Sequence, residues 1–160
     1  MKRAAALSTA LLLAACASPP AAVPWEARLW GDGIVLLGEV HDNAALHRLR
    51  LELLGRAFAS GWRPALALEM FDRERQPELE RARRERPGDA QHLIDAAGGP
   101  GWQWELYRPF LELALAYDVP IVAANLSRDD VRRIAHEGPG SVFAGGELAA
   151  LGLEREIPAD

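Results

Sequence analysis

The feature that most constrains the fold is an alternation of short apolar runs with longer stretches of helical pattern. The apolar runs lie at 34–37, 65–69 and 119–124. The helical stretches lie at about 44–59, 73–86 and 102–117. Strands that alternate with helices favour a parallel sheet with crossover connections. The sequence therefore predicts an α/β domain, in which helices flank a parallel sheet on both faces.

Capping residues and the spacing of charges predict where the helices begin and which faces they expose. Asp42 and Asn43 precede the stretch 44–59 and are typical N-caps. Three charged residues spaced by four predict the solvent-facing stripe of that stretch: Arg48, Glu52 and Arg56. Pro109 predicts either a kink in the stretch 102–117 or the start of a second helix. Ser127 begins a further helix, with acidic residues in its first turn.

The N-terminus has the pattern of an export signal. Lys2 and Arg3 precede a mostly apolar run over residues 4–15, which suits the core of a signal peptide. The run ends in Leu-Ala-Ala before Cys16, which resembles the lipobox of bacterial lipoproteins. The alternative is an ordinary secretory signal with a cysteine nearby. Since Cys16 is the single cysteine, it also excludes an internal disulfide framework.

These patterns divide the chain into three parts: a signal peptide (1–15), a lipidated cysteine with a flexible tether (16–29), and a folded domain (30–160). Removing the signal takes away Lys2 and Arg3, so the net charge moves from −5 to −7. An acidic domain has no electrostatic footprint for nucleic acid. The residue after the cysteine is Ala17 rather than an aspartate. By the lipoprotein sorting rule of many Gram-negative bacteria, this favours the outer membrane, with the protein facing the periplasm. We expect the domain to be partial, because a new helical pattern begins just before the last residues.

Polar residues follow each apolar run. Glu39 and His41 follow the first run, Glu69 ends the second, and Asn125 ends the third. Ligands bind beyond the carboxyl ends of the strands in such sheets, so these residues predict a site at one edge.

His47 belongs to the same predicted site. It lies in the first turn of the helix over 44–59 and shares the packed stripe with Leu51, Leu54 and Phe58. Two carboxylates and two imidazoles would thus converge. They could bind a metal ion, perform acid–base chemistry or hold a larger cofactor. Taken singly, each has a simpler interpretation as a capping, hydrogen-bonding or buried residue. His92 and His136 are expected at the surface.

These motifs together resemble the ChaN family. The relevant segments are Gly-Glu-Val-His-Asp-Asn over 38–43 with His47; Ala-Leu-Glu-Met-Phe over 67–71 with Gln76; Trp104, Tyr107 and Pro109; and Val-Pro-Ile-Val-Ala-Ala-Asn over 119–125 with Arg128. ChaN proteins are haem-binding lipoproteins of the Tiki and erythromycin-esterase-like superfamily. The resemblance covers residues 30–135, and family members are usually longer.

The resemblance implies haem as the ligand, stacked in pairs across a homodimer with a tyrosinate on each iron. Tyr107, in the Trp-x-x-Tyr-x-Pro stretch, is then the candidate iron ligand. The alternative is a core tyrosine, because Trp104, Tyr107, Leu111 and Leu115 form an apolar stripe. The residues that would line the haem site are Glu39, His41, His47, Glu69, Tyr107, Asn125 and Arg128. Arg108 and Arg128 would meet the propionates or lie free at the surface.

The sequence thus predicts a membrane-anchored, non-catalytic haem-binding protein for iron uptake or storage, with an outer-membrane haem receptor as a further partner. The alternative is a metal-dependent hydrolase of the same superfamily, in which Glu39, His41 and Glu69 coordinate the metal or activate water. A third interpretation is a truncated reading frame whose product folds poorly.

Overall fold

The computed structural model describes residues 33–153. The chain divides into two compact units at Val35, and every helix and strand of the described residues belongs to the second unit, Leu36–Asp160. The elements are α1 (Ala44–Ala59), β1 (Leu66–Asp72), the short 3-10 helix η2 (Arg73–Arg75), α2 (Gln76–Glu85), α3 (Ala90–Ala97), α4 (Trp104–Ala116), β2 (Ile121–Asn125), α5 (Arg128–Glu137), the 3-10 helix η3 (Pro139–Ser141) and α6 (Gly145–Leu151). The signal peptide, Cys16 and the tether lie outside the described residues.

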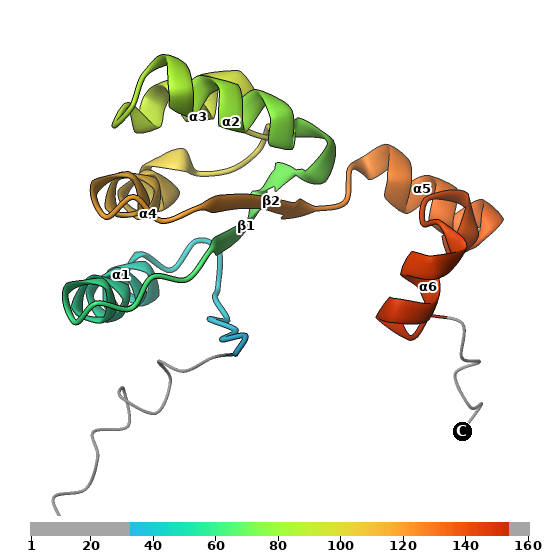
Figure 1. The fold of residues 1–160 in the computed structure, drawn as a ribbon, viewed down its shortest axis with the longest axis horizontal. Helices are drawn as coiled ribbons and strands as arrows, with labels where there is room; N and C mark the ends of the chain where they lie inside the picture. Colours follow the sequence, from blue (N-terminus) through green and yellow to red (C-terminus); the bar gives the residue numbers. More distant parts are fainter. Residues whose placement is uncertain (1–32, 154–160) are drawn as a thin grey trace, which may run out of the picture. The chain divides into compact units, whose positions relative to one another are not determined.

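The sheet has two parallel strands, which confirms the predicted α/β class. β1 pairs with β2 (Figure 1). Leu66 lies opposite Ile121, and Asp72 lies opposite Asn125. The chain between them forms α2, α3 and α4, as a parallel pair requires a long crossover. The carboxyl ends of both strands therefore lie at the same edge of the sheet.

The two faces of this sheet differ in exposure. On one face Leu68, Met70, Ile121 and Ala123 are buried. On the other face Ala67, Glu69, Val122 and Ala124 are exposed. Within the described residues, the helices therefore cover the first face of the sheet and leave the second face exposed. A register shift between Leu68 and Asp72 also buries Phe71.

The strand predicted over 34–37 is wrong. These residues form no helix or strand, and the side chains of Ile34 and Leu36 are 92% and 89% exposed. An apolar run becomes a buried strand only when a neighbouring strand pairs with its backbone. No strand of the described residues pairs with this run, so its sequence pattern alone could not place it in the sheet.

Most helices form where the sequence predicts them. α1 has the predicted bounds, and the side chain of Asn43 accepts hydrogen bonds from the backbone N–H groups of Ala45 and Leu46. Pro109 lies inside α4, which stays a single helix. α3 was not predicted. Its eight residues are too few for the sequence to show a clear period, and Asp89 caps it by accepting from His92 N–H.

The core lies between the helices and the buried face of the sheet. α4 contacts both α1 and α3, and α2 contacts α3. The fully buried large side chains are Phe58, Phe71, Leu79, Leu93, Tyr107, Leu111 and Val119. Tyr107 is thus part of the core through its ring, at the N-terminal end of α4.

Gln76 occupies the outer edge of β2. Its amide oxygen accepts from Ala123 N–H at 2.7 Å, and its amide nitrogen donates to the carbonyl oxygen of Ile121 at 3.2 Å. The side chain thereby makes the two hydrogen bonds that a third strand would make. This contact fixes the start of α2 against the sheet.

We expect Gln76→Leu to lower the free energy of unfolding by about 1–3 kcal/mol, because two backbone groups of β2 lose their partner. Urea unfolding followed by circular dichroism measures the change. Gln91→Leu is the matched control, since among residues 33–153 the Gln91 amide donates to the exposed Asp95 carboxylate and to no backbone group. Equal losses in the two variants would show that Gln76 does not stabilise the β2 edge.

Candidate functional site

Three side chains meet around the carboxylate of Glu39. One carboxylate oxygen, Oε1, accepts from the Tyr107 hydroxyl at 2.6 Å and lies 2.7 Å from His41 Nδ1. The other, Oε2, accepts from the guanidinium of Arg50. The Glu39 side chain is 13% exposed. We call Glu39, His41, Arg50 and Tyr107 the Glu39 cluster.

Three segments position this cluster. Glu39 and His41 come from the segment before α1, which turns where Asn43 N–H donates to the carbonyl oxygen of Val40. Arg50 comes from α1 and Tyr107 from the first turn of α4. Since α1 and α4 pack together, their side chains reach the same carboxylate.

The cluster fixes the charges of its two acidic groups. Burial alone would raise the pKa of Glu39, but hydrogen bonds from Tyr107, His41 and Arg50 outweigh it and lower that pKa to about 2. Burial, followed by the hydrogen bond to Glu39, raises the pKa of the Tyr107 hydroxyl. At neutral pH the cluster therefore contains a carboxylate and a protonated phenol.

His47 lies beneath the cluster, at the packed position that the sequence predicts. It is 3% exposed, and its Nε2 donates to the carbonyl oxygen of His41 at 3.1 Å. Its ring meets Tyr107 edge-on, with 4.9 Å between centroids. No described group bonds its buried Nδ1. His47 therefore holds the backbone at His41 and packs against Tyr107.

Trp102 forms an aromatic wall beside the cluster. Its ring lies edge-on to His41, with centroids 5.1 Å apart, and to Tyr107, with centroids 5.5 Å apart. The His41 side chain remains 61% exposed. The open imidazole thus lies next to an apolar surface.

Sequence reasoning missed Arg50 and Trp102. Arg50 is three residues after His47 on α1, so the helical period already placed both on one face. Trp102 lies just before α4, and no periodic pattern marked it.

Three predicted site residues lie outside the cluster. Glu69 is exposed, and its charge contributes to the raised pKa of Tyr107 without a hydrogen bond. Asn125 donates to the Asp72 carboxylate at 2.9 Å and so ties the ends of β1 and β2 together. Arg128 is exposed at the start of α5. No hydrogen bond, ion pair or ring contact of the described residues joins these three to the Glu39 cluster.

The second tyrosine of the chain, Tyr117, lies at the opposite end of α4 from Tyr107, against Phe58 and Arg63. The two histidines expected at the surface differ in exposure. His92 is half-buried and pairs with Glu85 at 3.1 Å, and His136 is exposed.

The alternative metal site does not form in the described part of the chain. Within residues 33–153, no three His, Cys, Asp or Glu side chains are arranged to hold a metal ion. Glu39 and His41 are adjacent, but Glu69 does not join them.

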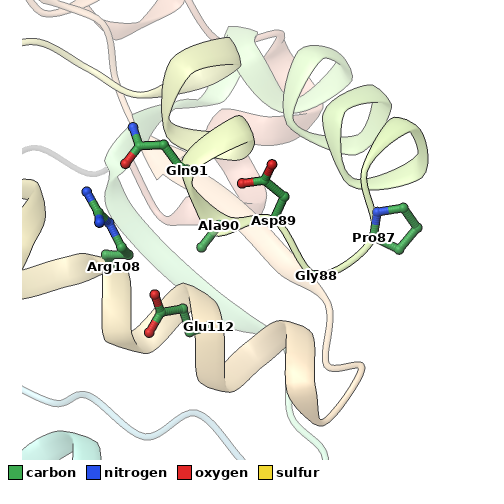
Figure 2. Close-up of a pocket in the computed structure, with 7 residues that line it drawn as sticks. All are labelled: Pro87, Gly88, Asp89, Ala90, Gln91, Arg108 and Glu112. Atoms are coloured by element: carbon green, nitrogen blue, oxygen red, sulfur yellow. The ribbon is translucent and has the colours of Figure 1, made fainter.

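A separate, open depression of about 500 Å³ lies on the surface between α4 and the start of α3. Figure 2 shows Arg108 and Glu112 of α4 across from the segment 87–91. No member of the Glu39 cluster lines it, so Arg108, a candidate for the propionates, lies on this different surface.

The chain therefore forms an α/β domain with a parallel sheet, in which the Glu39 cluster places an open imidazole and a phenol beside one carboxylate. A family model described as haem-binding uptake, Tiki superfamily, ChaN matches residues 26–159. The chain belongs to this family, and the resemblance in its motifs is confirmed.

One solved structure, described as cofacial heme binding to ChaN of Campylobacter jejuni, matches with 24% identity and a TM-score of 0.60. The match covers 71% of this chain and 47% of that one, so the chain spans about half the length of the solved structure. At this identity the match shows a shared fold. No curated protein matches the sequence.

Proposed function

We propose that this chain binds haem for iron uptake or storage and does so without catalysis. The observation that supports it most is the match of the haem-binding family model to residues 26–159. The solved relative is described with cofacial haem, and we extend that ligand to this chain as part of the proposal.

The donor chemistry of the Glu39 cluster fits haem. Imidazole and phenolate are both protein ligands of haem iron. His41 Nδ1 and the Tyr107 hydroxyl lie 3.2 Å apart, so the two side chains belong to one small site. Trp102 offers an apolar ring beside them, as a porphyrin surface requires. Bound haem would supply the redox-active iron, and this chain would hold and orient it.

We expect ferric haemin to bind the full chain with a saturable change in the Soret band, measured by absorbance titration. The double variant His41→Ala/Tyr107→Phe removes both side chains of the cluster that could bind the iron. It should therefore show no saturable change in the Soret band. His92→Ala is the control, because His92 pairs with Glu85 away from the cluster. A wild-type spectrum identical to that of haemin in buffer would contradict the proposal.

We also propose that the protein is anchored to the outer membrane through lipid on Cys16 and faces the periplasm. Within the described residues, no helix is long and apolar enough to cross a membrane. Cys16 follows a run that suits a signal peptide. A homodimer across stacked haems and an outer-membrane receptor as haem donor complete the proposal.

Cells grown with radioactive palmitate should label this protein, and Cys16→Ser should abolish the label, because the thiol of Cys16 is the acyl acceptor. Fractionation should place the labelled protein in the outer membrane. Ser18→Ala, two residues further on, is the control and should keep the label. Labelling of the Cys16→Ser variant would show that the lipid is attached elsewhere.

A further inference from the structure

We propose that two copies of this chain exchange helix α5, so that α5 of each copy covers the exposed face of the other copy's sheet. The two surfaces involved lie outside the Glu39 cluster, and the exchange needs no haem. The inference therefore goes beyond the proposed function. It also gives a role to Glu69 and Arg128, which are exposed and lie outside that cluster.

The exposed face of the sheet is the first of the two surfaces. Parallel sheets almost always have both faces covered. In this sheet one face stays exposed through four residues, which we call the open sheet face: Ala67, Glu69, Val122 and Ala124. Three of these side chains are small and apolar, and the Glu69 carboxylate pairs with no cation of the described residues. The open sheet face therefore fits a helix that offers small apolar residues and one free positive charge.

The outer stripe of α5 is the second surface. Arg128, Val131 and Ala135 are spaced by three and four residues, so they lie on one side of the helix. All three are exposed, and Val131 is 52% exposed. Arg132 pairs with Asp129, whereas no carboxylate of residues 33–153 pairs with Arg128. The outer stripe therefore has the small apolar residues and the free cation that fit the open sheet face.

An ion pair keeps α5 from covering its own sheet. Asp130 lies on the other side of α5, is 7% exposed, and accepts from Arg73 of η2 at 3.1 Å. Arg73 also lies over the ring of Phe143, 5.0 Å from its centroid. Moving α5 away from η2 would leave the buried carboxylate without its partner, which is costly. The helix therefore stays beyond the end of β2, as Figure 1 shows, with its outer stripe free for another molecule.

A second copy of the chain satisfies both surfaces at once. Each copy carries one open sheet face and one outer stripe, so a two-fold dimer makes the same contact twice. In each contact Glu69 of one copy pairs with Arg128 of the other, and Val131 packs against the small side chains of the sheet. Leu151 and Leu153, which follow α5 in the chain and are 58% and 47% exposed, add apolar surface. Exchange of an element between identical copies is a common route to such dimers.

Sedimentation velocity of the haem-free full chain tests the assembly. We expect a dimer in equilibrium with the monomer. Ala124→Arg places a long cation on the open sheet face and should weaken the dimer at least about tenfold. Ala59→Arg, at the exposed end of α1, is the matched control and should leave the equilibrium unchanged. A chain that is monomeric at every concentration, or equal effects of the two variants, would overturn the inference.

Charge reversal tests the pairing of the two surfaces. Glu69→Arg and Arg128→Glu should each weaken the dimer, because each brings two like charges together across the interface. The double variant Glu69→Arg/Arg128→Glu should recover most of the affinity. A double variant that dimerises no better than the single variants would overturn the pairing of these surfaces. Circular dichroism of each variant verifies that it is folded.

Chemical cross-linking identifies the occupant of the open sheet face. In the full chain with Cys16→Ser, one preparation carries Ala124→Cys and a second carries Val131→Cys. A short bis-maleimide added to their mixture should join one chain of each kind, whereas Ala59→Cys in place of Ala124→Cys should give no such product. A chain with both Ala124→Cys and Val131→Cys should also form a cross-linked dimer. A cross-linked monomer would show that α5 covers its own sheet and would overturn the exchange. Since all these measurements use haem-free protein, a failure to bind haemin would leave their outcome unchanged.

Discussion

Glu39→Gln should lower the free energy of unfolding by about 2–3 kcal/mol, since it removes the charge that three donors share. Arg50 would lose its counterion at a site where the two side chains are only 18% and 13% exposed. The Tyr107 and His41 donors would compete for one remaining amide oxygen, and the amide N–H group would face a donor. Urea unfolding at pH 7 measures the change.

Glu52→Gln is the matched control for this prediction. Glu52 also pairs with an arginine of α1, Arg56, but the two side chains are 61% and 62% exposed. Exposed pairs contribute little, so we expect a change of no more than about 0.5 kcal/mol. Comparable losses in Glu39→Gln and Glu52→Gln would show that the Glu39 cluster has no special stabilising role.

The same carboxylate should make stability depend on acid pH. The pKa of Glu39 falls from 4.5 to about 2 on folding, so its contribution is complete above pH 5 and disappears as the pH falls toward 2. The shift sets an upper bound of about 3.4 kcal/mol on this contribution, which solvent screening reduces. Unfolding curves between pH 7 and 2 should show a smaller loss for Glu39→Gln than for the wild type. Parallel pH profiles would contradict the lowered pKa.

Leu111→Ala should have the largest effect of any substitution considered, about 3–4 kcal/mol. Leu111 is fully buried on α4, the helix that contacts both α1 and α3. The cavity would lie one helical turn beyond Tyr107, so the variant should also loosen the Glu39 cluster. Thermal and urea unfolding measure the stability, and haemin titration measures the effect on binding.

Leu49→Ala removes the same atoms from an exposed position, because Leu49 on α1 is 60% exposed. It should change the free energy of unfolding by less than about 0.5 kcal/mol. If Leu49→Ala were as costly as Leu111→Ala, the face of α1 that bears Leu49 would be covered in solution.

The sequence by itself determined the features that depend on neighbouring residues. The bounds of α1 and its Asn43 cap follow from helical period and capping chemistry within a few residues. β1 and β2 follow from apolar runs with polar ends, and the packed position of His47 follows from counting along one helix. The order of such motifs along the chain was also enough to identify the family.

Only the tertiary structure decided which of these residues meet. The apolar run over 34–37 has the composition of a buried strand, yet strand formation depends on a partner far away in the chain. Glu69 has the same place in the sequence pattern as Glu39, but of these two carboxylates the described donors of α1 and α4 reach Glu39 and not Glu69.

The same reasoning applies to Tyr107. Its position in the motif marks it as important, but the motif cannot tell whether its hydroxyl faces a ligand or donates to Glu39, 68 residues earlier. Hydrogen bonds between distant segments are set by how helices pack, and helix packing depends on the whole core at once. Local sequence patterns therefore found the candidate residues, and the packing of α1 against α4 assigned their contacts.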